Sequence, residues 1–135
     1  MNREHDDVFE FMVQCGQQNP ENRLITALPS AEVQKLRMKL IREETAELQI
    51  AFIQNDLVEV ADALADLLYV TYGAAVACGI DIEPIFDEVH KSNMTKFIDG
   101  HKEPGGKWIK GPSYVPPQLE PILLEQGWVK APLKS

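Results

Sequence analysis

Residues 57–78 read LVEVADALADLLYVTYGAAVAC, and this stretch decides the fold class. It is nearly continuous in valine, alanine and leucine, and it is compatible with a helix throughout. Asn55 and Asp56 make a short break before it, and Gly79 closes it as a C-terminal glycine. A helix that is apolar on most of its faces is expected at the centre of a bundle.

Three more helices are predicted around this one. Apolar residues at helical spacing predict the first over residues 5–18. A serine N-cap and a 3.6-residue period predict the second over residues 30–54. The fourth is capped by Asp81 or Glu83 and ends near Ile98. Four helices with short connections indicate an all-α four-helix bundle.

The composition changes at Gly100. Six of the nine prolines, five of the eight glycines and both tryptophans lie in residues 100–135. The stretch is too apolar for a typical disordered segment. We therefore expect one domain, with a helical bundle over residues 1–99 and an irregular tail over 100–135. The tail is expected to pack on the bundle or on a neighbouring subunit.

The charge balance excludes some partners. The chain has 13 Lys and Arg against 21 Asp and Glu, a formal charge of -8. This argues against sequence-independent binding to nucleic acid, which usually needs a basic face. No apolar run approaches the roughly 18 to 20 residues that span a bilayer, and the N-terminus is charged. We expect a cytoplasmic protein without a membrane partner. Because the protein is acidic, it would need a cation to bind a polyanion.

Acidic residues interrupt the apolar face of the second predicted helix. Glu44 and Glu47 fall on the same stripe as Leu40 and Ala51, at steps of three or four residues. Glu43 lies beside Glu44, so three carboxylates surround a single turn.

The third predicted helix repeats this pattern with Glu59, Asp62 and Asp66, which lie within about 60° of one another. Asp62 and Asp66 stand among alanines, valines and leucines, where a carboxylate is hard to solvate. Several uncompensated carboxylates in one place would repel one another and take up protons. A divalent cation would remove that penalty.

Hard oxygen ligands without clustered His or Cys favour Mg²⁺ or Mn²⁺. Two acidic turns on antiparallel helices would form an acidic surface that holds a metal-bound triphosphate and polarises a water. The alternative is a solvated helix face on which the glutamates pair with Arg37, Lys39 and Arg42.

Candidate phosphate ligands follow further along the chain. Asn93 and Lys96 lie one turn apart and suit phosphate oxygens, although such residues often form a solvated C-terminal turn. Lys107, Trp108 and Lys110 would contact a nucleotide if the tail folds over the site. Packing of the tail explains Trp108 equally well.

These motifs resemble those of a known superfamily. Glu43, Glu44 and Glu47, followed by Glu59 and Asp62, are similar to the EExxE and ExxD motifs of the all-α nucleoside triphosphate pyrophosphatases. This MazG-like superfamily includes dimeric dUTPases and phosphoribosyl-ATP pyrophosphohydrolase. The chain most resembles the short MazG-like branch with dUTPase-like activity, through ADLLYVTYG (65–73), SNMTK (92–96) and GKWIKGPSY (106–114).

The resemblance implies hydrolysis between the α and β phosphates of a nucleoside triphosphate, giving the monophosphate and pyrophosphate. The substrates would be dUTP or other unwanted (deoxy)nucleoside triphosphates. It further implies two or three Mg²⁺ or Mn²⁺ ions held by the acidic residues, with Glu43 orienting or deprotonating the attacking water. Asn93 and Lys96 would contact phosphates, and the protein would be a homodimer or a homotetramer with sites near the subunit interface.

The sequence departs from the pattern at one place. In an ungapped alignment Asp66 falls on the ExxD aspartate, but the position of its glutamate holds Ala63. Either Asp62 takes the place of that glutamate, or Glu59 reaches in from one turn upstream.

Two other classes of protein are alternatives to the pyrophosphatase. A non-catalytic helical bundle would use its acidic faces to pair with a basic partner. A di-iron carboxylate bundle needs Glu-x-x-His pairs, which none of Glu43, Glu44, Glu47 and Glu59 provides. The interaction protein is therefore the remaining alternative to the enzyme.

Overall fold

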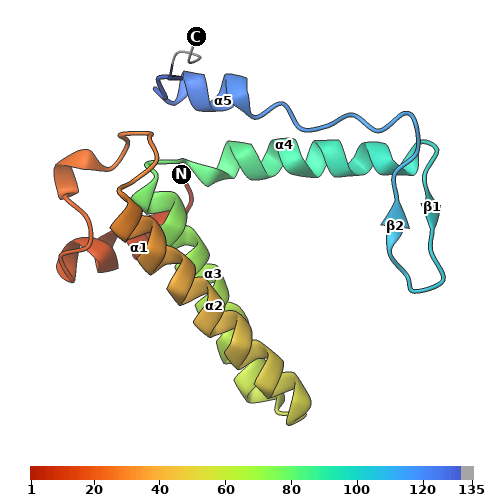
Figure 1. Ribbon diagram of the computed structural model, residues 1–135, viewed down its shortest axis with the longest axis horizontal. Coiled ribbons are helices and arrows are strands. Elements are labelled where there is room, and N and C mark those ends of the chain that lie inside the picture. Colours follow the sequence, from red (N-terminus) through yellow and green to blue (C-terminus); the bar gives the residue numbers. More distant parts are fainter. Residues whose placement is uncertain (132–135) are drawn as a thin grey trace.

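The structure is a computed structural model that describes residues 1–131; the last four residues of the predicted tail, 132–135, lie outside the described part. The elements in chain order are α1 (Arg3–Gln14), the 3-10 helix η1 (Pro20–Asn22), α2 (Ala31–Ile53), α3 (Leu57–Ala77), α4 (Ile82–Met94), the 3-10 helix η2 (Thr95–Phe97), β1 (His101–Lys102), β2 (Trp108–Ile109) and α5 (Glu120–Glu125). The expected all-α fold is confirmed (Figure 1).

Side-chain caps set the beginnings of the long helices. Ser30 accepts from the backbone N–H of Val33 at the start of α2, and Asp81, rather than Glu83, caps α4. The first helix begins earlier than expected because Asn2 accepts from the N–H of His5, and it ends at Gln14, before a glycine with positive φ. Each boundary follows from residues within one turn of it.

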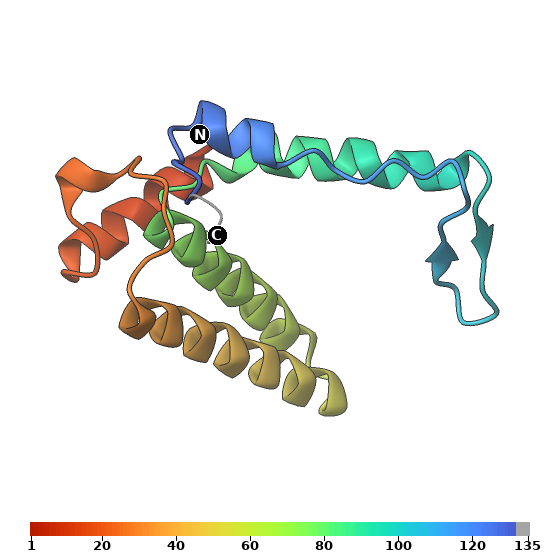
Figure 2. The ribbon, with the colours of Figure 1, turned by 45° about the horizontal axis from the view of Figure 1, so that its top comes forward.

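The third helix lies at the centre of the packed part, as its composition predicts. α3 runs along α2 and also contacts α1 (Figures 1 and 2). Val8 and Met12 of α1 and Val76 of α3 form the small core. By length and composition α3 is apolar enough to cross a membrane, despite its three acidic residues. Only part of this apolar helix is buried, because α1 and α2 do not cover all of it.

One cation is buried between the first three helices. Arg37 is 7% exposed and donates to Gln17 Oε1 at 2.7 Å. Gly73 of α3 makes the space for it, since a Cβ there would lie 2.5 Å from Arg37 Nη1. Arg37 thus joins α2 to α3 and to the loop after α1, rather than pairing with the glutamates of its own helix.

The fourth helix does not join the other three within one chain. Beyond Gly79 the chain turns, and α4 projects away from the end of α3 (Figures 1 and 2). The tail forms an antiparallel hairpin of β1 and β2 at the tip of α4, returns along α4 in an irregular path and ends in α5. The tail therefore packs on α4.

Candidate metal centre

The acidic residues of the two long helices come together as the sequence predicts. α2 and α3 are joined by the short turn Gln54–Asp56 and run side by side, so the turn around Glu44 faces the turn around Asp66. One carboxylate oxygen from each of Glu44, Glu47 and Asp66 lies within 4.8 Å of the others. We call these three residues the acidic cluster.

Among residues 1–131, no ion pair involves the three residues of the acidic cluster. Oε2 of Glu44 is buried and has no hydrogen-bond partner. Desolvation, then a hydrogen bond with Glu47 and the charges of Glu47, Asp66 and Asp62, raise the pKa of Glu44 to about 7. Desolvation and the same neighbouring acids also raise the pKa of Asp66. This is the electrostatic signature of a site that a cation would stabilise.

A hollow beside the acidic cluster contains the remaining candidates on α3. Glu47, Glu59 and Asp62 all line it. The charge of Asp62 acts on both Glu44 and Asp66, whereas Glu59 contributes to neither shift. Both residues line the hollow, and of the two only Asp62 acts electrostatically on the acidic cluster.

The surroundings of Asp62 differ from the expectation. Its side chain is exposed, as are those of Val58, Leu64 and Leu68 on the same helix. The prediction that Asp62 lies among buried apolar side chains is wrong, because α1 and α2 cover only part of α3. Asp66 is half-buried and fits the prediction better.

Glu43 lies outside the acidic cluster. Its side chain is exposed, and its carboxylate is 4.0 Å from Lys39 Nζ, one turn earlier on α2. A solvated helix face is therefore the correct description of Glu43 in this conformation. It does not describe Glu44, whose carboxylate has a buried oxygen.

The candidate phosphate ligands lie elsewhere in the chain. Lys96, Lys107, Trp108 and Lys110 line one pocket at the tip of α4 together with Ile109 and Tyr114; we call it the tip pocket. Asn93 is exposed on the last turn of α4 and does not line it. The structure separates the tip pocket from the acidic cluster, since the hairpin and the lower half of α2 and α3 lie far apart in both views (Figures 1 and 2).

Tyr114 also lines the tip pocket, although it was not predicted to be a site residue. Lys110 Nζ lies 4.7 Å from the centre of its ring and Lys96 Nζ lies 5.8 Å from it. The signal was present in the GKWIKGPSY motif, in which Tyr114 follows Lys110 by four residues.

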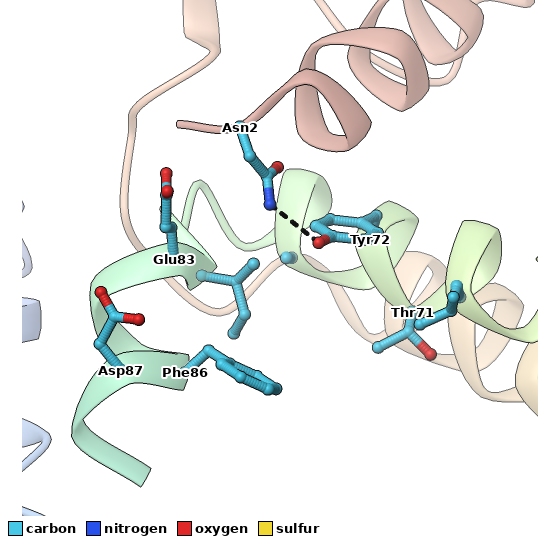
Figure 3. Close-up of a pocket in the computed structure, with 9 residues that line it drawn as sticks. Asn2, Thr71, Tyr72, Glu83, Phe86 and Asp87 are labelled. Atoms are coloured by element: carbon cyan, nitrogen blue, oxygen red, sulfur yellow. Dashed lines mark hydrogen bonds between the residues drawn. The ribbon is translucent and has the colours of Figure 1, made fainter. Parts of the chain in front are cut away.

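A further pocket lies at the elbow between α3 and α4 (Figure 3). Its floor is apolar and includes Phe86, and Asn2 donates across it to the Tyr72 hydroxyl at 2.9 Å. Glu83 and Asp87 supply carboxylates on one side. Such a lining would repel phosphate, so this pocket is separate from the chemistry of the acidic cluster.

Comparison with known proteins identifies the family. The model of the phosphoribosyl-ATP pyrophosphohydrolase family matches residues 11–93, more than half of the chain. The chain belongs to this family. The resemblance inferred from the acidic motifs is thus confirmed.

One relative is similar over a shorter stretch. The uncharacterized protein L479 of Acanthamoeba polyphaga mimivirus is 41% identical over 66 residues, which are 47% of this chain and 26% of that protein. The chain therefore spans only about a quarter of the length of this relative.

The family match includes the whole acidic cluster and ends at Asn93. The tip pocket, which begins with Lys96, lies outside it. The matched region thus contains the acidic cluster, and the tip pocket follows it in the chain.

The raised pKa of Glu44 predicts how pH acts on the metal-free protein. Its pKa in the fold, about 7, exceeds the ordinary value of 4.5. Between these values the unfolded chain binds fewer protons than the folded one, so stability falls as the pH rises through this window. In EDTA, we expect a lower Tm at pH 8 than at pH 5.5, and a smaller difference in Glu44→Gln.

Thermal unfolding of the metal-free protein at pH 5.5 and pH 8 measures this difference in Tm. Glu32→Gln is the matched control, because it removes an exposed carboxylate from the first turn of the same helix. An equal fall of Tm in Glu44→Gln and in the control would contradict the prediction.

Proposed function

We propose that the chain is a metal-dependent nucleoside triphosphate pyrophosphohydrolase. It would cleave between the α and β phosphates and release a nucleoside monophosphate and pyrophosphate, with dUTP or other (deoxy)nucleoside triphosphates as substrates. The observation that carries the proposal is the acidic cluster, in which one oxygen each from Glu44, Glu47 and Asp66 lies within 4.8 Å of the others. Membership of a pyrophosphohydrolase family supports it.

The residues present fit a divalent cation. All the donors are carboxylate oxygens, which suit Mg²⁺ or Mn²⁺. The buried oxygen of Glu44 without a partner is an atom that such a cation would satisfy. Glu44, Glu47 and Asp66 would hold the ions, two or three per site, with Asp62 or Glu59 completing the set from the adjacent hollow. Bound there, the cations would neutralise phosphate charge and acidify a water.

The chain's own residues would then position the reactants. Glu43 is proposed to orient or deprotonate the attacking water from the edge of the acidic cluster, which requires it to leave Lys39. Asn93 and Lys96 are proposed to contact the phosphates. Because cleavage between the α and β phosphates releases pyrophosphate, the phosphate ligands would hold the β and γ phosphates, which leave together.

We further propose that the chain works as a homodimer or a homotetramer. Large apolar side chains are exposed on both halves of the molecule, and contiguous exposed apolar surface commonly marks an interface. Those at the free end of α2 and α3 are Ile50, Phe52, Ile53, Leu57 and Val58, and those along α4 and its tip are Phe86, Met94, Phe97 and Ile98. A second copy of the chain is the partner that would cover both sets.

Pyrophosphate release tests the proposed activity. The substrates are the common dNTPs, dUTP, the NTPs and phosphoribosyl-ATP, each with Mg²⁺, Mn²⁺ or EDTA. We expect metal-dependent release from one or more (deoxy)nucleoside triphosphates and none in EDTA. Release from phosphoribosyl-ATP alone would overturn the proposed substrate class. A folded, oligomeric protein that releases pyrophosphate from nothing in the panel would contradict the activity and favour the interaction protein.

A further inference from the structure

A buried arginine lies at the upper end of the two acidic helices. The Arg37 side chain is buried, and among the ion pairs of residues 1–131 none involves it. Desolvation lowers the pKa of its guanidinium. An apolar side chain of similar volume often serves stability better than a buried charge, whereas a buried polar group is well suited to fixing one register between helices.

The neighbours of Arg37 come from three separate segments. Its Nη2 donates to Gln17 Oε1 at 2.7 Å, and its Nη1 lies 3.9 Å from Met12 Sδ of α1. On α3 the space comes from Gly73, where a Cβ would lie 2.5 Å from Nη1. Gly73 is the one glycine of α3, so every other level of that helix carries a side chain. The guanidinium therefore fits at the level of Gly73.

Arg37 is one of two points at which α2 is anchored. In the described part of the chain, α2 has two buried side chains, Arg37 and Ala51. Ala51 lies near the turn Gln54–Asp56, which joins α2 to α3, and Arg37 lies in the second turn of α2. Glu44 is midway, seven residues from each anchor and within about 20° of the same face. The position of Glu44 on α3 is thus fixed from both sides.

The contact between Arg37 and Gly73 has the same register as the acidic cluster. α2 and α3 are joined by a short turn and run side by side in opposite directions (Figure 2). Glu44 follows Arg37 by seven residues, and Asp66 precedes Gly73 by seven. Equal steps in opposite directions along an antiparallel pair lead to facing positions. A contact of Arg37 with Gly73 therefore places Glu44 opposite Asp66.

A slide of one helical turn would bring a different set of acids together. Glu44 would then face Asp62 in place of Asp66, and Glu47 would face Glu59. One turn is about 5.4 Å of helix. The oxygens of the acidic cluster lie within 4.8 Å of one another, so such a slide would separate them. The register thus decides which acids of α3 complete the site.

The environment of Arg37 excludes the shifted register. Arg37 would then meet Tyr69 in place of Gly73. The ring of Tyr69 packs edge-on against Phe11 of α1, with 5.6 Å between ring centres, so it is not free to leave that space. The guanidinium would also move away from Gln17, its hydrogen-bond acceptor. A buried guanidinium without these partners would be strongly destabilising.

We propose that Arg37 is a positioning residue for the acidic cluster, because it holds α2 on α3 in the register that sets Glu44 opposite Asp66. The inference rests on the proposed function for what the acidic cluster binds. Arg37 is two turns from Glu44, about 10 Å along the helix, and so acts through α2. Gly73 shares the role by leaving room for the guanidinium.

Binding of Mn²⁺ without nucleotide tests the positioning role. Arg37→Met replaces the cation by an unbranched apolar side chain and leaves Gln17, which is exposed, free to bond water. We expect the variant to fold and to bind Mn²⁺ at least about tenfold more weakly than the wild type. Electron paramagnetic resonance of free Mn²⁺ measures the affinity, well below the Tm of each variant. Unchanged or tighter binding would overturn the proposal.

The sign of the change separates positioning from charge. Removal of a cation near the site would by itself strengthen Mn²⁺ binding. Arg42→Met is the matched control, because it removes an exposed arginine from the same helix, closer to Glu44 in the sequence. It should bind Mn²⁺ at least as tightly as the wild type. Equal weakening in Arg42→Met and Arg37→Met would contradict a special role of Arg37.

Gly73→Ala tests the same contact without removing the cation. Alanine favours a helix more than glycine does, so any loss comes from the displaced guanidinium. We expect weaker Mn²⁺ binding in Gly73→Ala, and no further loss when the same substitution is added to Arg37→Met. A loss that adds in full in the double variant would show that the two residues act separately and would overturn the shared role.

Cross-linking in EDTA tests the register itself. Both native cysteines are first replaced by alanine, and a bifunctional thiosulfonate with a one-carbon spacer then joins engineered pairs. Glu44→Cys/Asp66→Cys should cross-link faster than Glu44→Cys/Asp62→Cys, and Arg37→Met should reduce this preference. The same preference with and without Arg37 would overturn the proposal.

These measurements distinguish the two failures. If the wild type binds Mn²⁺ and Arg37→Met binds it equally well, the proposed metal site stands and the positioning role is wrong. If the wild type binds no Mn²⁺, the metal dependence in the proposed function fails, and cross-linking still decides whether Arg37 sets the register of α2 on α3.

Discussion

Asp66→Asn and Glu47→Gln are each expected to lower metal-dependent pyrophosphate release by at least about 100-fold. Each substitution replaces a carboxylate of the acidic cluster by a neutral amide of nearly the same shape. The loss of one anionic oxygen weakens binding of the cation and, because the cation binds the phosphates, binding of the substrate as well. Initial rates at saturating Mg²⁺, with the best substrate of the panel, measure the effect.

Glu32→Gln is the control for these two variants. It changes the net charge equally, on an exposed residue of the first turn of α2, and should retain the wild-type rate. Glu43→Gln tests the proposed water-orienting role, since a residue that only pairs with Lys39 on the surface would show no loss. Wild-type rates in both Asp66→Asn and Glu47→Gln would remove the acidic cluster from the mechanism.

The same variants separate the enzyme from the interaction protein by their stability in EDTA. Desolvation and neighbouring carboxylates raise the pKa of Asp66, so its charged form is unfavourable in the metal-free fold. Asp66→Asn should therefore have a Tm equal to or above that of the wild type at pH 8. A lower Tm would indicate that Asp66 stabilises the fold itself, an outcome that the interaction protein allows and the enzyme does not.

Gly79→Ala is expected to destabilise the chain by about 3–5 kcal/mol, enough to lower the Tm by more than about 10 °C. Gly79 has φ +64, where a side chain costs about 1–2 kcal/mol. A Cβ there would also collide with the carbonyl group of Ile25, which is backbone and cannot rotate away. Thermal unfolding of the purified variant measures the change.

Gly16→Ala separates the two causes. Gly16 also has a positive φ, +77, but nothing lies within 4 Å of the position of its Cβ. Its substitution should cost only the conformational part, about 1–2 kcal/mol. Equal losses of stability in Gly79→Ala and Gly16→Ala would show that the close approach of Ile25 to residue 79 does not add to the destabilisation.

The order of the four long helices and several of their ends could be predicted because they depend on neighbouring residues. Ser30 caps α2 and Gly79 follows α3 as expected, since an N-cap side chain bonds a backbone group three residues away and a C-terminal glycine acts on its own turn. The spacing of Glu44 and Glu47 likewise placed both on one face of α2, toward Asp66. The helical period shows which residues share a face of a helix, and no knowledge of the tertiary fold is needed for that.

Burial could not be predicted in the same way, as two residues show. The alternative of a solvated helix face paired Arg37 with the glutamates of α2, but Gly73 and the loop after α1 enclose Arg37. Asp62 was expected among buried side chains, but the face of α3 that carries it is uncovered. Whether a residue is covered depends on which distant segment packs over it, and helical spacing does not contain that information.

By itself the sequence determined the four long helices, the caps at Ser30 and Gly79 and the pairing of acidic turns on α2 and α3, because these depend on contacts within a turn and on one short connection. Only the tertiary structure decided that α4 points away from α3, and that residues 96–114 close into one basic pocket at its tip. Both depend on hydrogen bonds between segments far apart in the chain, such as those of Thr26 with Gly79 and of Ser92 with Val115. Such bonds are selected by the packing of the whole chain, and no local pattern reveals them.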